Sequence, residues 1–192
     1  MKQPRVGVLA VQGDFEKHQR MVAQLDAIPL LVKTAEQLHK CQGLIIPGGE
    51  STTLSLMLRK HGLWDELKSF ARDHPIFGTC AGLILLATKV DSTPIESLGL
   101  IDIQVKRNAY GRQINSFIDT VKVDLGGGPF DFEGVFIRAP KIASLGEEVR
   151  PLAWHGEEVV MAEQGNVLAA TFHPELTDDT RIHEYFLHKL TK

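Results

Sequence analysis

The first half of the chain alternates short apolar runs with longer amphipathic runs, and this order constrains the fold more than any other feature. RVGVLAVQG (5–13) begins with an apolar run that has no polar face, as expected of a parallel strand covered on both sides. DFEKHQRMVAQLDA (14–27) follows with apolar residues at helical spacing and with Asp14 placed as an N-cap. The repeated order of strand and helix predicts an α/β fold, in which helices cover both faces of a parallel sheet.

The same alternation continues as far as Lys89. Thr34 and Gln37 have the spacing of a capping box, which predicts the start of a short helix. Gly62 predicts a break in the long helical stretch that follows the third strand. The expected strands are PLLVK (29–33), GLIIPGG (43–49) and PIFGT (75–79), and the expected helices are TAEQLHK (34–40), STTLSLMLRKHGLWDELKSFARDH (51–74) and AGLILLATK (81–89).

The second half of the chain has a different character, because strand-like runs follow one another with few helical signals between them. These runs are GLIDIQVKRNAYG (99–111), INSFIDTVKVDL (114–125), GVFIRAP (134–140), PLAWH (151–155), EEVVMAEQG (157–165) and NVLAATFHPE (166–175). They predict antiparallel additions to the parallel sheet, within a single domain that spans 1–192. DDTRIHEYFLHKL (178–190) is amphipathic and predicts a closing helix.

Composition excludes several classes of function. A net charge of −3 offers no basic footprint for nucleic acid, and no apolar run approaches the roughly 18 residues that span a bilayer. Two cysteines in 192 residues are too few for a disulfide framework, so a reducing, cytoplasmic setting is expected. The N-terminus turns polar after a short apolar run, which indicates a first strand and not a signal peptide.

One of the two cysteines stands in the frame Gly78-Thr79-Cys80-Ala81-Gly82, between a predicted strand and a predicted helix. This pattern is typical of a nucleophile elbow, in which glycines allow a tight turn and close backbone packing. The N-terminus of the following helix lowers the pKa of a thiol and favours the thiolate. A small buried cysteine at a strand end is the alternative, so a general base is needed to decide.

Among eight histidines, His173 is the best candidate for that base. It stands in TFHPEL (171–176), where Pro174 favours an extended conformation for the residue before it. In an extended segment His173 and Glu175 point to the same side, so Glu175 can orient the imidazole. A histidine beside a surface glutamate is the alternative. His155 ends a strand and is left undecided, and the remaining histidines are taken as ordinary surface or core residues: His18, His39, His61, His74, His183 and His188.

IIPGGEST (45–52) ends a strand and opens a helix, so the backbone N–H groups of Gly48, Gly49 and Glu50 are expected to face free space. Such donors suit an oxyanion hole. A plain turn and an anion cradle for phosphate are the alternatives. A P-loop is excluded because the Gly-Lys-Ser/Thr ending is missing.

PGGEST (47–52), GTCAGL (78–83) and FHPEL (172–176), in this order and spacing, resemble the class I, triad-type glutamine amidotransferase family. AGLIL after Cys80, together with RNAYGRQ (107–113) and GVFIRAP (134–140), is most similar to the branch formed by the glutaminase subunits of pyridoxal 5'-phosphate synthases. The similarity covers essentially the whole chain. Tyr110 departs from the phenylalanine common in the family, but an aromatic ring is retained.

The resemblance implies a doubly wound, three-layer α/β sandwich with a mostly parallel central sheet. It implies hydrolysis of L-glutamine to glutamate and ammonia, with Cys80 as nucleophile, His173 as base and Glu175 as its orienting partner. It implies no metal and no cofactor. The residues it assigns to the glutamine pocket are Gly48, Gly49, Glu50, Ser51, Arg107, Ile137 and Arg138. A guanidinium, from Arg107 or Arg138, suits the α-carboxylate of glutamine, whereas alone these residues are typical surface arginines.

The resemblance also implies a partner, a separate synthase subunit that accepts the ammonia and activates the glutaminase when the two dock. Two alternatives stay open. The same triad can feed another acceptor, in histidine or nucleotide biosynthesis, although AGLIL after Cys80 argues against this. The fold can also serve as a catalytically silent regulatory module, against which the presence of Cys80, His173 and Glu175 counts.

Overall fold

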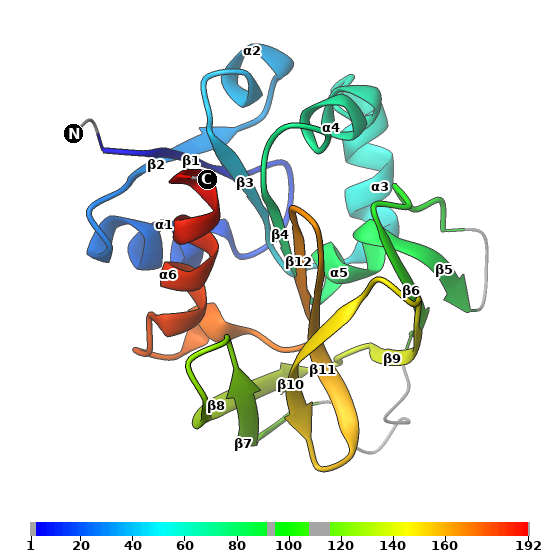
Figure 1. Cartoon of the computed structure of the whole chain (residues 1–192). Helices are drawn as coiled ribbons and strands as arrows, with labels where there is room; N and C mark the ends of the chain where they lie inside the picture. Colours follow the sequence, from blue (N-terminus) through cyan, green and yellow to red (C-terminus); the bar gives the residue numbers. More distant parts are fainter. Residues whose placement is uncertain (1–2, 92–94, 108–115, 192) are drawn as a thin grey trace.

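The computed structural model describes residues 3–91, 95–107 and 116–191 (Figure 1). Its main sheet has nine strands within these ranges. In spatial order they are β2 (Ile28–Val32), β1 (Arg5–Leu9), β3 (Gly43–Ile46), β4 (Ile76–Thr79), β12 (Val167–Ala170), β11 (Glu158–Gln164), β10 (Arg150–His155), β7 (Ser116–Asp124) and β8 (Pro129–Ile137). The first five pair in parallel and the others pair antiparallel, which confirms the predicted parallel sheet with antiparallel additions.

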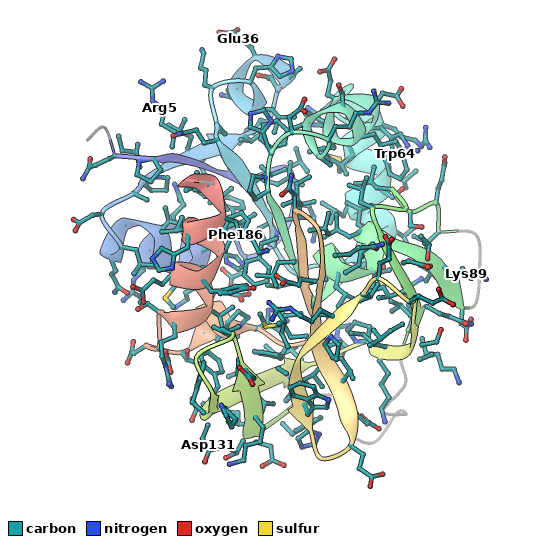
Figure 2. All side chains as sticks on the ribbon, in the orientation of Figure 1. Arg5, Glu36, Trp64, Lys89, Asp131 and Phe186 are labelled. Carbon is teal, nitrogen blue, oxygen red and sulfur yellow. The ribbon has the colours of Figure 1, made fainter. Side chains whose placement is uncertain are left out.

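Helices cover both faces of this sheet, so the predicted three-layer α/β sandwich is confirmed. On one face, α1 (Phe15–Gln24) and α6 (Arg181–His188) share a core with the strands (Figure 1). Phe186 extends from α6 into that core, whereas Glu36 and Asp131 lie at the periphery (Figure 2). The other face carries α3 (Ser51–Lys60), α4 (Trp64–Phe70) and α5 (Ala81–Leu86), with the short α2 (Ala35–Leu38) joining the same core.

A second, three-stranded sheet was not predicted; it consists of β5 (Ala87–Asp91), β6 (Ile101–Lys106) and β9 (Lys141–Leu145). The expectation of a helix over 81–89 is therefore wrong beyond Leu86. Ala87 is already extended, with ψ at 151°, and the β-branched Thr88 and Val90 favour a strand. The Thr88 hydroxyl is 3.1 Å from the carbonyl oxygen of Ile103, which ties β5 to β6.

Several element boundaries differ from the predictions. β1 ends at Leu9 and not at Gly13. The last strand ends at Ala170 and not at Glu175, and Pro174 opens a short 3₁₀ turn, η1 (Pro174–Leu176). The capping box of Thr34 and Gln37 is confirmed, and the chain closes with η2 (Lys189–Thr191). Most of the RNAYGRQ motif, including Tyr110, and the expected start of a strand at 114–115 lie outside the described residues.

The carboxyl ends of the parallel strands carry the motifs that the sequence singled out. Gln12 follows β1, Gly48 follows β3, Cys80 follows β4 and His173 follows β12. Because these strands are parallel neighbours, their carboxyl ends lie at one edge, where doubly wound sheets hold their ligands. No helix in the described ranges combines the length and apolar character needed to cross a membrane.

Candidate active site

Cys80 lies at the tight turn between β4 and α5, as the elbow pattern predicts. Its backbone has φ 49° and ψ −103°, a conformation that costs free energy for a residue with a side chain. The turn is held by its backbone N–H, which donates to the Ala170 carbonyl at 2.9 Å. The thiol points towards the carbonyl oxygen of Ile137, 3.7 Å away. The turn therefore fixes the sulfur at the carboxyl edge of the sheet.

Glycines on either side of Cys80 make this turn possible. A Cβ on Gly78 would lie 2.7 Å from the carbonyl carbon of Gly82, and a Cβ on Gly82 would collide with the carbonyl oxygen of Ile46. Both contacts are with backbone, which has little freedom to move aside. The two glycines thus allow α5 to pack directly on β3 and β4, as the sequence predicts.

His173 and Glu175 contact each other at the end of β12. Nδ1 of His173 is 2.7 Å from Oε1 of Glu175, and both side chains are almost fully buried. The predicted contact is present, but the predicted reason is wrong, because Glu175 lies in η1 and not in an extended strand. The 3₁₀ turn after Pro174 folds the carboxylate back towards the ring.

The charges of this pair support each other. Burial alone lowers the pKa of His173, but hydrogen bonds to Cys80 and Glu175, and their charges, outweigh it and raise the pKa to about 10. For Glu175, burial favours the neutral acid, but the charges and hydrogen bonds of His18 and His173 hold its pKa well below the usual value. An ionised carboxylate behind a readily protonated imidazole is the arrangement that a base beside a thiol requires.

A cavity of about 370 Å³ opens above Cys80 and His173. The seven residues expected in the glutamine pocket line it with them: Gly48, Gly49, Glu50, Ser51, Arg107, Ile137 and Arg138. Glu175 is the one predicted site residue outside the lining, because it lies behind His173. The cavity is also lined by residues that were not among those expected in the glutamine pocket: Gln12, Asp14, Ile84, Pro140 and Leu176.

The PGGE loop is held by two contacts of Glu50. Its carboxylate caps α3 by accepting from the backbone N–H groups of Thr52 at 3.1 Å and Thr53 at 2.6 Å. Burial is the largest single effect and raises the pKa of Glu50, but the bonds from Thr52 and Thr53 together outweigh it and lower the pKa to about 2. The same carboxylate is 3.5 Å from the Arg107 guanidinium, which places that cation at the cavity wall.

One expectation for this loop is wrong. The backbone N–H of Glu50 does not face free space, because it donates to Oε1 of Gln12 at 3.2 Å. Gly49 has φ 155°, and a Cβ there would press against the Gln12 amide. The Gln12 side chain therefore accepts a hydrogen bond from a backbone N–H that was expected to serve the oxyanion hole.

Cys41, the second cysteine, lies away from the cavity at the start of β3. Burial raises the pKa of its thiol to about 11, against a smaller opposing effect of Arg5, and the thiol is 3.3 Å from the carbonyl oxygen of Gln37. Such a thiol is protonated and unreactive at neutral pH.

Cys41→Ser is therefore expected to leave the release of ammonia from glutamine within about twofold of wild type, because the hydroxyl can keep the bond to Gln37. Steady-state assays of the purified variant with its synthase partner check this. A deep loss of activity without a loss of fold would mean that the wrong thiol has been assigned.

The fold and the site together define a class of protein, the triad-type glutamine amidotransferases. A solved structure described as a glutamine amidotransferase superposes with a TM-score of 0.91 at 44% identity, covering 97% of this chain and 99% of that one. Residues 8–192 match the SNO glutamine amidotransferase family, and the chain belongs to that family. This confirms the resemblance that the motifs indicated.

Curated relatives agree over nearly their whole length. The pyridoxal 5'-phosphate synthase subunit PdxT of Thermosipho africanus is 47% identical over 189 residues, which is 98% of this chain and 100% of the relative. The subunit of the same name from Pseudothermotoga lettingae is 50% identical over 184 residues, 95% of this chain and 93% of the relative. The structure of PurLQS from Thermotoga maritima, at 15% identity and a TM-score of 0.78, shares the fold.

Proposed function

We propose that this chain hydrolyses L-glutamine to L-glutamate and ammonia, with Cys80, His173 and Glu175 as the catalytic triad. The observation that carries the proposal is the sulfur of Cys80 at a turn of positive φ, in one cavity with an imidazole that is bonded to a buried carboxylate at 2.7 Å. A thiol, a base and an orienting group in this order suit acyl transfer.

The reaction follows from the charges at the site. The thiolate of Cys80 attacks the side-chain amide carbon of glutamine, and a C–S bond forms as the carbonyl oxygen takes up negative charge. His173, protonated by the thiol proton, gives that proton to the amide nitrogen, and ammonia leaves as the C–N bond breaks. Water, deprotonated by His173, then attacks the γ-glutamyl thioester, releases glutamate and restores the thiol. Glu175 stabilises the imidazolium in both halves of the cycle.

Some groups around the cavity bind the reacting amide of glutamine, and others bind its α-amino-acid end. Backbone N–H groups of the Gly48–Gly49 loop and of Ala81, which follows the nucleophile, are the donors we assign to the oxyanion. Arg107 or Arg138 pairs with the α-carboxylate, since a guanidinium can bind it through two hydrogen bonds. Glu50, Ser51 and Ile137 complete the pocket, with Glu50 holding Arg107 in place.

The acceptor of the ammonia is a separate pyridoxal 5'-phosphate synthase subunit. The names of the PdxT relatives, which align over almost their full length, support this assignment. We assign residues 1–192 to one glutaminase domain in the cytoplasm. The two free cysteines suit a reducing compartment, where a thiol nucleophile stays active.

This function is tested by the release of ammonia from glutamine, measured for the full chain alone and with increasing amounts of the synthase subunit. We expect slow release by the isolated chain and a rise of severalfold or more on addition of the synthase, because docking completes the oxyanion hole. No release at any synthase concentration would contradict the proposed function. Full activity of the isolated chain would contradict only the activation by the partner, and not the hydrolysis of glutamine.

Gln12→Ala is expected to weaken this activation more than it weakens folding. The Gln12 amide holds the N–H of Glu50 across the PGGE loop, at 3.2 Å, so it controls a donor beside the reacting carbonyl. The dependence of ammonia release on synthase concentration, with a thermal melt of each protein, measures both effects. An activation curve identical to that of wild type would remove this role from Gln12.

A further inference from the structure

A cluster of buried polar side chains lies behind Glu175, and the proposed chemistry does not use it. His18 comes from α1, Thr79 is the last residue of β4, and His183 comes from α6. All three are completely buried, and the Phe77 ring packs nearly perpendicular to both imidazoles. Burial of polar groups costs free energy unless they are hydrogen bonded, so their partners indicate what they do.

The cluster ends on the carboxylate of Glu175. One oxygen, Oε1, accepts a hydrogen bond from Nδ1 of His173. The other, Oε2, has no partner of good hydrogen-bond geometry among the described residues, but Nε2 of His18 lies 3.4 Å away. The same nitrogen is 3.2 Å from the Thr79 hydroxyl, and Nδ1 of His18 is 3.0 Å from Nε2 of His183.

The protons in this chain of contacts can be assigned from His183. Burial is the largest cause that lowers the pKa of His183, to about 3, so its imidazole is neutral and carries one N–H. Its Nδ1 has no partner within the described residues. A bare acceptor is tolerated there more readily than an unpaired N–H, so the proton belongs on Nε2. His183 then donates to Nδ1 of His18, which leaves Nε2 of His18 as a donor that faces Glu175 and Thr79.

The other charged groups near Glu175 are less well placed to do this. Lys17 and Arg20 on α1, and Asp178 after η1, line a cavity of about 70 Å³ with Glu175. Lys17 and Arg20 are exposed to solvent, which screens their charges. Among the described residues, His18 is the donor besides His173 that approaches the buried carboxylate from the protein interior.

We propose that His18 is a positioning residue of the glutaminase, which presents its Nε2–H to the second carboxylate oxygen of Glu175 and is itself oriented by His183. A carboxylate held at both oxygens cannot rotate. It therefore keeps the proton of the neutral His173 ring on Nδ1 and leaves Nε2 to face Cys80. The network extends this control to α1 and α6, both of which lie on the face of the sheet opposite α5. The inference rests on the proposed function of the triad.

Two closely matched variants test this role. The amide of His18→Gln reaches about as far as Nε2 of the imidazole, so it can still donate to Glu175. The amide of His18→Asn reaches only the position of Nδ1, so it faces His183 and leaves Oε2 without a donor. We expect the asparagine variant to lose about 10- to 100-fold in kcat, by analogy with the loss caused by removing the hydrogen-bond partner that orients a metal-binding histidine. We expect the glutamine variant to recover most of that loss.

KM for glutamine is expected to stay nearly constant in both variants, because His18 does not line the substrate cavity. The pH profile supplies a second readout. Loss of the donor raises the pKa of Glu175, weakens its support of the imidazolium and lowers the pKa of His173. The upper pH limb of kcat/KM, which requires protonated His173, therefore moves to lower pH in His18→Asn and returns in His18→Gln.

Leu67→Ala in α4 is the stability control. Leu67 is fully buried in α4, a helix that lies near the amino end of β4 and away from α5 (Figure 1), so this variant loses core packing without touching the network. With the synthase subunit at saturating concentration, it should melt at a lower temperature than wild type and keep the wild-type pH profile. A profile that shifts equally in Leu67→Ala and His18→Asn would reduce His18 to a structural residue.

Nitrogen NMR of the wild-type chain, with ¹⁵N-labelled histidine, gives a test that needs no active variant. We expect Nε2 of His18 to carry a proton, and the signal is assigned by its loss in His18→Gln. A bare Nε2 on His18, or equal kcat and pH profiles in the two variants, would overturn the inference while leaving glutamine hydrolysis intact. Absence of ammonia release by the wild type with its synthase would instead overturn the proposed function.

Discussion

Cys80→Ala is expected to reduce the release of ammonia from glutamine to a trace, a loss on the order of 10⁶-fold if the thiol is the nucleophile. No other described residue lining the cavity carries a thiol, and the second cysteine is buried elsewhere with a pKa raised to about 11. The measurement is ammonia release at saturating glutamine and saturating synthase. Release within about 100-fold of wild type would remove Cys80 from the role of nucleophile.

The fold of this variant is expected to survive. Alanine is smaller than cysteine, and the positive φ at this position costs both residues a similar free energy. The thiol has a long contact to the Ile137 carbonyl at 3.7 Å and a hydrogen bond with His173, and when the thiol is removed His173 is still held by its bond to Glu175. A melting temperature close to that of wild type, and unchanged binding to the synthase, separate loss of chemistry from loss of structure.

Glu175→Gln is expected to lower kcat by roughly 10⁴-fold, the size of the loss seen when the carboxylate of a triad is removed. The carboxylate offers two acceptors, one to His173 at 2.7 Å and one towards His18 at 3.4 Å, whereas an amide offers one acceptor and one donor. The change also removes the charge that stabilises the imidazolium. The pKa of His173 therefore falls from its raised value, and the upper pH limb of activity moves to lower pH.

Glu163→Gln is the matched control for this prediction. Glu163 is a partly buried carboxylate in β11 that is bonded to Arg150, Tyr185 and Lys189, and it does not line the substrate cavity. We expect it to melt at a lower temperature and to keep kcat within about twofold of wild type. Equal losses of kcat in the two variants would show that general destabilisation, and not the triad, explains the effect of Glu175→Gln.

The parallel half of the fold could be predicted because its strands are apolar on both faces and end at short, recognisable turns. β1, β3 and β4 appear at the predicted places, although β1 ends at Leu9, where the chain turns to carry Gln12 across the edge of the sheet. The second sheet could not be predicted. β9 (Lys141–Leu145) has only half-buried and exposed residues, and β5 continues an apolar run that has the pattern of a helix.

The triad could be predicted because each member stands in a local pattern with a known geometry. The GTCAG segment forms the predicted tight turn, and the HPE pattern does bring Glu175 to His173, although through a 3₁₀ turn. Local patterns say less about contacts between distant segments. The bond between Gln12 and Glu50 joins two loops and occupies an N–H that was expected to be free.

His18 shows the same limit more clearly. It stands on a helix beside ordinary polar residues, and it meets His183, which is 165 positions away in the sequence. Only the packing of α1 and α6 on the same face of the sheet brings the two rings together. The sequence showed only a histidine on an amphipathic helix, and the burial of that histidine is seen only in the structure.

The central claim is that Cys80 attacks the side-chain amide of glutamine. A glutamine analogue with a chloroketone in place of the side-chain amide tests it most directly, because attack by the thiolate displaces chloride and leaves a stable thioether. The full chain with its synthase subunit is treated with the analogue, with and without excess glutamine, and the modified peptide is mapped by mass spectrometry. We predict one label per chain on Cys80, slowed by glutamine, with Cys41 unmodified. Labelling of Cys41, or labelling of Cys80 at a rate that glutamine does not change, would contradict the account.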